Sequence, residues 1–296
     1  MGLEFACPAC AGTAATRRAE RRVGDCLFHL VQCDTCGLYG ASPLPHEDLA
    51  ELSDRTTGEW YPECQDDVEL DADERDRALA LSRRRVADLE GRVSGRRLLD
   101  IGTGKGYIVA AAQERGWEAR GIETSRPAIE FARQHLGVEL HWGVWEQRPF
   151  AGETFSVVRL RHVLEHLHDP AGALAWAGEI MEPQGLLALE VPNAEALIYA
   201  LRNLGYRARG QAGRRHACGV DPPGHLWGFT CSTLSRLLGR VGFEAVELRA
   251  VGLGDPLHYP MVWSRLNTRR RMEWALDRAG CVFGRGSLLV CYAREK

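Results

Sequence analysis

The sequence predicts an α/β fold built on a parallel sheet, with a small cysteine-rich module in front of it. Strand-like and helix-like segments alternate from about residue 78 to the C-terminus, and this alternation favours a parallel sheet. One early strand-like segment runs directly into a glycine-rich turn at 102–106, and two C-x2-C pairs lie near the N-terminus. We therefore predict a zinc-ribbon module at 1–42, an acidic linker with a short helix at 43–77, and the α/β domain at 78–296.

The composition restricts the classes of protein that the chain can belong to. Its 296 residues allow one large domain and one small one. With 37 basic and 40 acidic side chains, the net charge of −3 argues against a protein held mainly by nucleic-acid phosphates. No stretch approaches the roughly 20 apolar residues that span a bilayer, and the N-terminus lacks the pattern of a signal peptide. We expect a soluble, cytoplasmic protein.

The two cysteine pairs, Cys7–Cys10 and Cys33–Cys36, are separated by 22 residues. Four thiolates at this spacing suit a tetrahedral structural zinc site with no position left for a substrate. Between the pairs, residues 25–32 read as a strand that returns to the second pair. A thioredoxin-like redox motif would use only one pair. The other six cysteines are expected to be small buried hydrophobic residues.

The linker carries few structural signals. A short helix is expected soon after Pro45, and eight acidic residues against one basic residue mark 63–76 as a solvated linker. Apolar positions from about Arg77 to Leu89 fit an amphipathic helix that docks on the following domain.

The glycine-rich turn, Asp100-Ile-Gly-Thr-Gly-Lys-Gly106, is the strongest motif in the chain. Its glycines allow the backbone to approach a ligand closely. The dinucleotide fingerprint G-x-G-x-x-G would need glycine at position 107, where the chain has Tyr107, and the chain contains no Walker loop. A carboxylate at Asp100 would repel a pyrophosphate but suits a cationic or hydroxyl-bearing ligand. The turn therefore argues against NAD.

This turn resembles the first motif of the class I S-adenosylmethionine (SAM)-dependent methyltransferases, (D/E)-x-G-x-G-x-G. The next strand-like segment, WEARGIE, ends at Glu123, where that family places an acidic residue that binds the ribose hydroxyls. The later sequence HVLEH, from His162 to His166, resembles the ubiquinone-biosynthesis branch, and the N-terminal module resembles a zinc-ribbon subset of the family. The resemblance implies a Rossmann-like sheet of seven strands, the last antiparallel, and SAM as the cofactor.

The resemblance also implies which residues bind SAM. Relatives often carry an Asp near residue 144 that bonds the adenine amine, but this chain does not, so adenine is expected to meet backbone and Val144 or Trp145. Thr124 and Ser125 are expected to cap the following helix. The implied cofactor residues are Asp100, Gly102, Thr103, Gly104, Gly106, Tyr107, Glu123, Thr124, Val144 and His162.

Methyl transfer to a hydroxyl group needs a general base with a pKa near the working pH, which favours histidine. The candidates are His162, His166 and His225, with Glu165 orienting a histidine or binding the acceptor. Each histidine has an alternative interpretation as a helix cap or a buried, hydrogen-bonded side chain. A turn of the Pro-Gly type is expected at 183–185, between a helix and the next strand.

We expect a SAM-dependent methyltransferase that acts on a small hydroxylated metabolite, sugar-containing or a natural product, with O-methylation favoured over C-methylation. Basic stretches at 195–215 and 265–271 could meet a phosphate or carboxylate of the acceptor, meet an RNA, or be exposed helix faces. The alternatives are an rRNA methyltransferase that uses the ribbon to bind RNA, and a binding protein without catalysis. The string H-x-x-E-H also matches a zinc-peptidase motif, but that motif requires a helix. Neither a nucleic-acid nor a membrane partner is expected.

Overall fold

The computed structural model describes residues 5–45, 72–252, 255, 257 and 268–296. The helix predicted after Pro45 and most of the acidic run at 63–76 lie outside the described residues. The amphipathic helix predicted from Arg77 is present, but it begins earlier and spans Ala72–Glu90 (α2).

A seven-stranded sheet forms the centre of the large domain, in the order β10-β11-β8-β7-β4-β5-β6. β11 runs antiparallel to both of its neighbours, whereas all pairs from β8 to β6 are parallel. This topology confirms the predicted fold class. The strands are β4 (Arg97–Ile101), β5 (Glu118–Glu123), β6 (His141–Trp142), β7 (Phe155–Arg161), β8 (Met181–Pro192), β10 (Phe243–Val251) and β11 (Leu288–Glu295).

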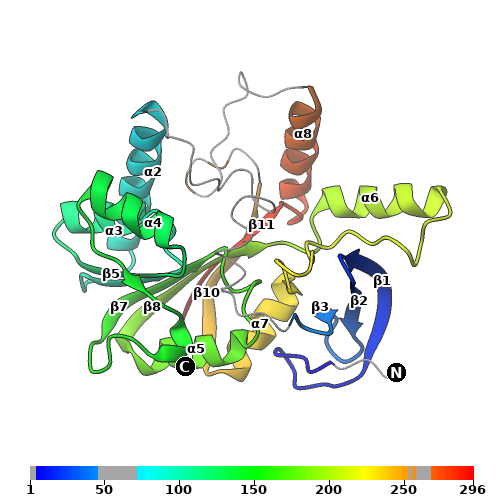
Figure 1. Cartoon of the computed structure of the whole chain (residues 1–296), viewed down its shortest axis with the longest axis horizontal. Coiled ribbons are helices and arrows are strands. Elements are labelled where there is room, and N and C mark those ends of the chain that lie inside the picture. The colour runs from blue at the N-terminus through cyan, green and yellow to red at the C-terminus, as the bar shows by residue number, and fades with distance from the viewer. Residues whose placement is uncertain (1–4, 46–71, 253–254, 256, 258–267) are drawn as a thin grey trace.

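Helices cover both faces of this sheet. Figure 1 shows α2, α3 and α4 over one face and α5 and α7 on the opposite face. None of the described helices combines the length and apolar character that crossing a lipid bilayer requires. Besides α2, the helices are α3 (Tyr107–Glu114), α4 (Arg126–Phe131), α5 (Pro170–Glu179), α6 (Leu197–Ala208), α7 (Cys231–Arg240) and α8 (Thr268–Val282), with shorter turns at Ala132–Leu136 and Trp145–Gln147.

The alternation of side chains along each strand divides the core between the two faces. Leu98 and Val157 pack with residues of α2 and α3. Their chain neighbours Leu99 and Val158 pack with residues of α5 and α7. Because both faces are covered, the central strands are almost continuously apolar, as expected for a parallel sheet. A polar residue on one of these strands therefore requires a specific explanation.

The cysteine-rich module is joined to the large domain by a second sheet. This sheet has the order β1-β2-β3-β9, and its strands are β1 (Ala15–Val23), β2 (Cys26–Cys33), β3 (Tyr39–Ser42) and β9 (Trp227–Gly228). β9 comes from the large domain and pairs with β3 through Gly40 and Trp227. A Cβ atom on Gly40 would lie 2.7 Å from the Trp227 ring, so only glycine allows the two strands to approach this closely. The predicted boundary at residue 42 is thus bridged by hydrogen bonds.

Several local predictions differ from the structure. The turn predicted at 183–185 is an irregularity inside β8, which pairs with β7 on both sides of it, and Gln184 has φ 65° there. The strand predicted before Gly143 is limited to His141–Trp142. Ser125 alone caps α4, through a hydrogen bond from the backbone of Ala128. Of the cysteines outside the two pairs, Cys26 is exposed.

Replacement of Trp227 by alanine should destabilise the fold by about 3–5 kcal/mol, the usual cost of removing a buried aromatic side chain. Trp227 is 3% exposed, packs against Phe5 and donates its indole N–H to Leu167 O at 2.8 Å. Urea unfolding followed by circular dichroism measures the loss. The matched control is Trp142→Ala, because Trp142 is 49% exposed and should cost much less. Equal losses for the two variants would contradict the role given to Trp227.

Candidate functional site

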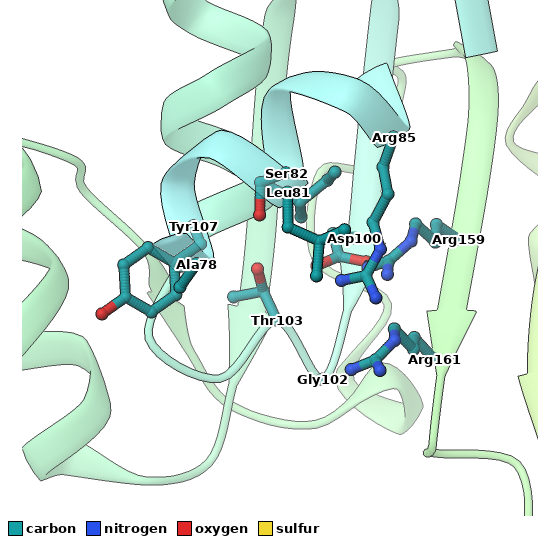
Figure 2. A pocket seen from close by; sticks show the side chains of 11 residues that line it. Ala78, Leu81, Ser82, Arg85, Asp100, Gly102, Thr103, Tyr107, Arg159 and Arg161 are labelled. Atoms are coloured by element: carbon teal, nitrogen blue, oxygen red, sulfur yellow. The ribbon is translucent and has the colours of Figure 1, made fainter. Parts of the chain in front are cut away.

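A cavity of about 370 Å³ opens at the carboxyl end of β4, beside the glycine turn. Ligands of open α/β sheets bind at such a position. Figure 2 shows Tyr107 on one side of the cavity and the guanidinium groups of Arg159 and Arg161 on the other, with Asp100 between them. The lining residues are Ala78, Leu81, Ser82, Arg85, Asp100, Gly102, Thr103, Tyr107, Ile108, Arg159 and Arg161. Four of the predicted cofactor residues, Asp100, Gly102, Thr103 and Tyr107, are among them.

The glycines of the turn are required by backbone geometry. Gly102, Gly104 and Gly106 have φ values of 67°, 59° and 73°, which side chains other than glycine rarely adopt. A Cβ atom on Gly102 would meet Val163 at 2.4 Å, whereas one on Gly104 would meet nothing within 4 Å. The turn therefore packs tightly against the segment after β7 and leaves open space at Gly104.

Glu123 lies at the end of β5, as predicted, and its carboxylate organises the glycine turn. One oxygen accepts a hydrogen bond from Gly104 N at 2.6 Å. The other accepts from the backbone N–H groups of Thr124 and Ser125 at 2.8 and 2.9 Å. Glu123 thus faces the turn directly, although it is not among the residues that line the cavity.

Asp100 forms a buried ion pair with Arg159. The two residues are register partners on the neighbouring strands β4 and β7, and Arg159 Nη1 lies 2.7 Å from Asp100 Oδ1. Both side chains are almost fully buried. Within the described structure, Asp100 Oδ2 and Thr103 Oγ1 are buried without a hydrogen-bond partner. Two polar atoms of the cavity wall are therefore available to a bound ligand, since buried polar groups are normally satisfied.

Three arginines give the cavity an excess of positive charge. Arg161 pairs with Glu190 on β8 at 2.9 Å, and Arg159 lies 4.0 Å from the same carboxylate. With Arg85, whose Nε donates to Leu257 O at 2.8 Å, the described residues supply three cations and the two anions Asp100 and Glu190. Burial and the neighbouring Arg161 and Arg159 lower the pKa of Arg85 to about 9. An anion beside Arg85 would relieve this repulsion.

The sequence-based prediction did not include these three arginines. Arg159 and Arg161 lie on β7, within the run Phe-Ser-Val-Val-Arg-Leu-Arg, where a buried parallel strand is expected to be apolar. Two arginines in a strand expected to be apolar could have been used to predict a charged site there. Arg85 gave no such signal, because an arginine on an amphipathic helix is ordinary.

His162 follows Arg161, the last residue of β7. Its backbone has φ 52°, in the left-handed region, which is uncommon for a residue other than glycine and is concentrated at functional sites. Its Nδ1 atom lies 3.5 Å from Glu165 Oε1, and the side chain is 31% exposed. Glu165 is fully buried, and neither carboxylate oxygen has a hydrogen-bond partner in the part of the chain that the structure describes. Burial would raise the pKa of Glu165, but the surrounding histidines, His162 first, hold it below its usual value.

His166 and His225 complete this cluster. Their rings meet edge to face with 4.7 Å between centroids. The Nδ1 atoms lie 3.1 Å from Gly224 O and 3.0 Å from Gly219 O, respectively. Because a carbonyl only accepts, each Nδ1 donates, and in the neutral rings Nε2 carries the lone pair. Burial lowers the pKa of His166 to about 4, which keeps that ring neutral at physiological pH.

The structure thus brings the four predicted catalytic residues together. Glu165, His166 and His225 each offer one ligand atom within 4.8 Å of the others, so they could also hold a metal ion. The zinc-peptidase interpretation of H-x-x-E-H is nevertheless wrong, since residues 162–169 form turns and not the helix that the motif requires.

The predicted adenine contacts are less well defined. Val144 is half-buried and begins the short turn Trp145–Gln147. Trp145 is 8% exposed and packs against Trp176 in the core, so little of its surface is accessible. Trp142, which pairs with Glu123 across β5 and β6, is far more exposed and donates its indole N–H to Thr124 O.

The four predicted metal ligands converge in the N-terminal module. Cys7 Sγ lies 3.5 Å from Cys36 Sγ, and Cys10 Sγ lies 3.5 Å from Cys33 Sγ. All four sulfurs lie within 4.8 Å of one another. A disulfide would need about 2.05 Å, whereas a zinc tetrahedron with Zn–S bonds of about 2.3 Å has edges of about 3.8 Å. The geometry fits a four-thiolate zinc site.

Comparison with protein-family models matches residues 72–248, more than half of the chain, to the family described as "Methyltransferase domain". The match includes the glycine turn and the histidine cluster but not the cysteine module.

The curated relatives are ubiquinone biosynthesis O-methyltransferases. The protein of Azorhizobium caulinodans is 30% identical over 173 residues, which are 56% of this chain and 65% of that protein. The protein of Alkalilimnicola ehrlichii is 32% identical over 126 residues, 40% of this chain and 51% of that protein. The chain therefore spans between about half and two thirds of the length of these relatives.

Solved structures show the same fold. Magnesium protoporphyrin IX methyltransferase from Synechocystis, with bound SAH, has a TM-score of 0.52 at 13% identity and covers 84% of this chain and 100% of that one. The CcbJ methyltransferase from Streptomyces caelestis has a TM-score of 0.50 at 15% identity and covers 72% and 89% of the two chains. At such identities the likeness concerns the fold. With the family match, it follows that the chain belongs to the methyltransferase-domain family and has the class I fold of SAM-dependent methyltransferases.

Proposed function

We propose that the chain transfers a methyl group from SAM to a hydroxyl group of a small metabolite, such as a sugar-containing compound or a natural product. The proposal depends on the arrangement at the carboxyl ends of β4 and β7. Beside the glycine turn lies a cavity that contains the available Asp100 Oδ2 atom and three arginines. His162, with its left-handed backbone, directly follows β7. The first feature suits the two charged ends of an amino acid, and the second suits proton removal from an acceptor.

In this proposal the cavity holds the methionine end of SAM. Asp100 Oδ2 would accept from the ammonium group, because it is buried and has no partner among the described residues. Arg85, with its neighbours Arg159 and Arg161, would bind the carboxylate, which removes the excess of positive charge. Charge-assisted hydrogen bonds of this kind are about twice as strong as neutral ones.

The nucleoside end would lie along the glycine turn toward Glu123 and Val144. Open space at Gly104 lets a ligand approach the backbone. Glu123 already accepts from Gly104 N, so the ribose hydroxyl groups would share its carboxylate with the turn. Thr124 and the exposed ring of Trp142 lie next to this position.

Bound SAM would supply the activated methyl group, and the protein would supply the alignment and the base. The chain aligns the acceptor and accepts one proton. We assign proton removal to His162, since its ring is partly exposed while Glu165 lies behind it at 3.5 Å. Glu165 orients the ring and stabilises the positive charge that the ring gains. His166 and His225 are placed to shape the acceptor side of the same cluster.

The names of the curated relatives favour oxygen as the methylated atom, and a histidine base suits a hydroxyl group. The same base could remove a proton from an acidic C–H group, so methylation of carbon is the second candidate.

We further propose that Cys7, Cys10, Cys33 and Cys36 bind one structural zinc ion. The fit of the sulfur–sulfur distances supports this assignment. A closed four-thiolate site stabilises a small module and does not itself catalyse.

The cofactor assignment predicts that Arg85→Ala weakens the binding of S-adenosylhomocysteine by roughly tenfold or more, the usual effect of losing one charge-assisted hydrogen bond. Isothermal titration calorimetry measures the affinity. Arg84→Ala is the matched control, because Arg84 is an exposed neighbour on α2 that does not line the cavity. Unchanged affinity in Arg85→Ala would remove Arg85 from the site.

The base assignment predicts that His162→Asn lowers kcat by about 10²–10⁴ with little change in the affinity for S-adenosylhomocysteine. Asparagine tolerates the left-handed backbone at this position, so the fold should persist. Production of S-adenosylhomocysteine is measured with a panel of hydroxylated acceptors, and His135→Asn, at an exposed histidine, serves as the control. Full activity of His162→Asn would transfer the role of base to His166 or His225.

The metal assignment predicts about one zinc per chain in the wild-type protein and a large loss of zinc, with a lower melting temperature, in Cys33→Ser. Elemental mass spectrometry measures the zinc content per chain, and thermal unfolding measures the melting temperature. Cys26→Ser is the control, since Cys26 lies at the start of the same strand but is exposed and outside the cluster. A Cys33→Ser variant that retains its zinc would rule out Cys33 as a ligand.

A further inference from the structure

A second cavity, of about 390 Å³, lies between the cysteine module and α6. It shares no lining residue with the cavity at the glycine turn. The module contributes residues of β1, β2 and β3, and the large domain contributes α6 and the segment that follows it. The lining residues are Arg17, Arg18, Gln32, Tyr39, Asn203, Arg207, Ala212, Gly213, Arg215 and His216.

The charge of this cavity is strongly unbalanced. Its wall carries four arginines and no aspartate or glutamate. Arg17 forms an ion pair at 2.8 Å with Glu20, which is exposed and does not line the cavity. Arg18 donates to the neutral side chain of Gln32 at 3.0 Å. Among the described residues, Arg18, Arg207 and Arg215 therefore have no acidic partner. In the first cavity, by contrast, Arg159 and Arg161 form ion pairs with Asp100 and Glu190.

A β-bulge directs two of the arginines into the same space. Adjacent residues of a regular strand point to opposite faces, so Arg17 and Arg18 would normally diverge. In the β1–β2 ladder Arg17 pairs with Val31 and Ala19 pairs with Leu30, which leaves Arg18 as the extra residue. Such bulges redirect side chains and are frequent beside active sites.

An aromatic pair lies beside the arginines. The rings of Tyr39 and His216 are tilted by 32°, with 5.4 Å between centroids. Burial lowers the pKa of His216, and Arg18 and Arg207 lower it further. The ring is therefore neutral at physiological pH, so it offers an aromatic surface and adds no further positive charge.

The segment that lines this cavity leads along the chain to the histidine cluster. Asn203 on α6 fixes the connecting segment by two hydrogen bonds with Ala217, at 2.9 and 2.7 Å. The same segment passes through Gly219, whose carbonyl accepts from His225 Nδ1 at 3.0 Å. His216 in the cavity and His225 in the cluster are thus only nine positions apart in the chain.

We propose that this cavity binds the diphosphate group of a nucleotide-linked acceptor, with Arg18, Arg207 and Arg215 on the phosphates and Tyr39 and His216 beside the base. The inference rests on the proposed function, because it takes the ligand to be the methyl acceptor. Guanidinium forks match phosphate oxygens in geometry as well as in charge. Aromatic side chains stack on nucleobases, and the volume lies within the range of about 300–1,000 Å³ usual for ligand sites.

The test is calorimetric titration of the full, zinc-containing chain with uridine diphosphate, guanosine diphosphate and inorganic pyrophosphate. We expect saturable binding of at least one nucleoside diphosphate, about tenfold or more tighter than pyrophosphate because of the aromatic pair. Arg18→Ala and Arg207→Ala should each weaken that binding about tenfold or more. The affinity for S-adenosylhomocysteine should not change in either variant.

The matched control is Arg214→Ala, an exposed arginine next to Arg215 that does not line the cavity and should leave binding unchanged. Because Arg18 and Arg207 are exposed, neither variant should alter the melting temperature, which checks that the fold persists.

Two results would overturn the inference while leaving the proposed function intact: binding of S-adenosylhomocysteine without any nucleoside diphosphate, or equal affinities for pyrophosphate and the nucleotides. Binding of a single-stranded RNA that Arg18→Ala and Arg207→Ala abolish, with no binding of the free nucleotides, would also overturn it. Failure of the wild-type chain to bind S-adenosylhomocysteine would instead count against the proposed function, whatever the nucleotides do.

Discussion

The register of the central sheet is the constraint on which the candidate site depends. Asp100 is paired with Arg159 between β4 and β7, and Arg161 is paired with Glu190 between β7 and β8. Both register pairs are also ion pairs. Because a slip of one residue would turn every side chain to the other face, the sheet that builds the core also fixes these charges. Asp100 and Arg159 are both buried, so loss of either one would leave a buried charge uncompensated, which typically costs about 3–5 kcal/mol.

The second sheet extends this hydrogen-bonded order to the histidine cluster. The pairing of β3 with β9 joins the cysteine module to the segment that carries His225, and the backbone N–H groups of Leu226 and Trp227 both donate to Glu165 O. The module, the segment before α7 and the turn after β7 are therefore parts of one hydrogen-bonded structure. The proposed zinc ion would therefore stabilise more than the module itself. Gln32 in the wall of the second cavity donates to Gly37 O, next to the predicted ligand Cys36.

The sequence identified the parts of the site that depend on local backbone geometry or short spacing. The glycine turn, the paired cysteines and the H-x-x-E-H segment each lie within a few residues, so their chemistry is visible in the chain. The charge network was not predicted, because Arg85 and Arg159 are 74 positions apart and meet only when α2 packs on the sheet. The basic cavity was anticipated only as a locally basic stretch at 195–215. Its other half depends on a bulge at Arg18, and nothing in the sequence of β1 marks where the ladder shifts register.

Under these two proposals, the cofactor and the acceptor would be recognised by different parts of the chain. The cavity at the glycine turn is lined by residues of α2, β4 and β7 and by the turn itself, all of which lie inside the matched residues 72–248. The second cavity takes Arg17, Arg18, Gln32 and Tyr39 from strands outside that match. Substrate specificity resides in sites added to a common fold rather than in the fold itself. A module that contributes half of the acceptor cavity would therefore give this chain an acceptor different from those of relatives that share only its methyltransferase domain.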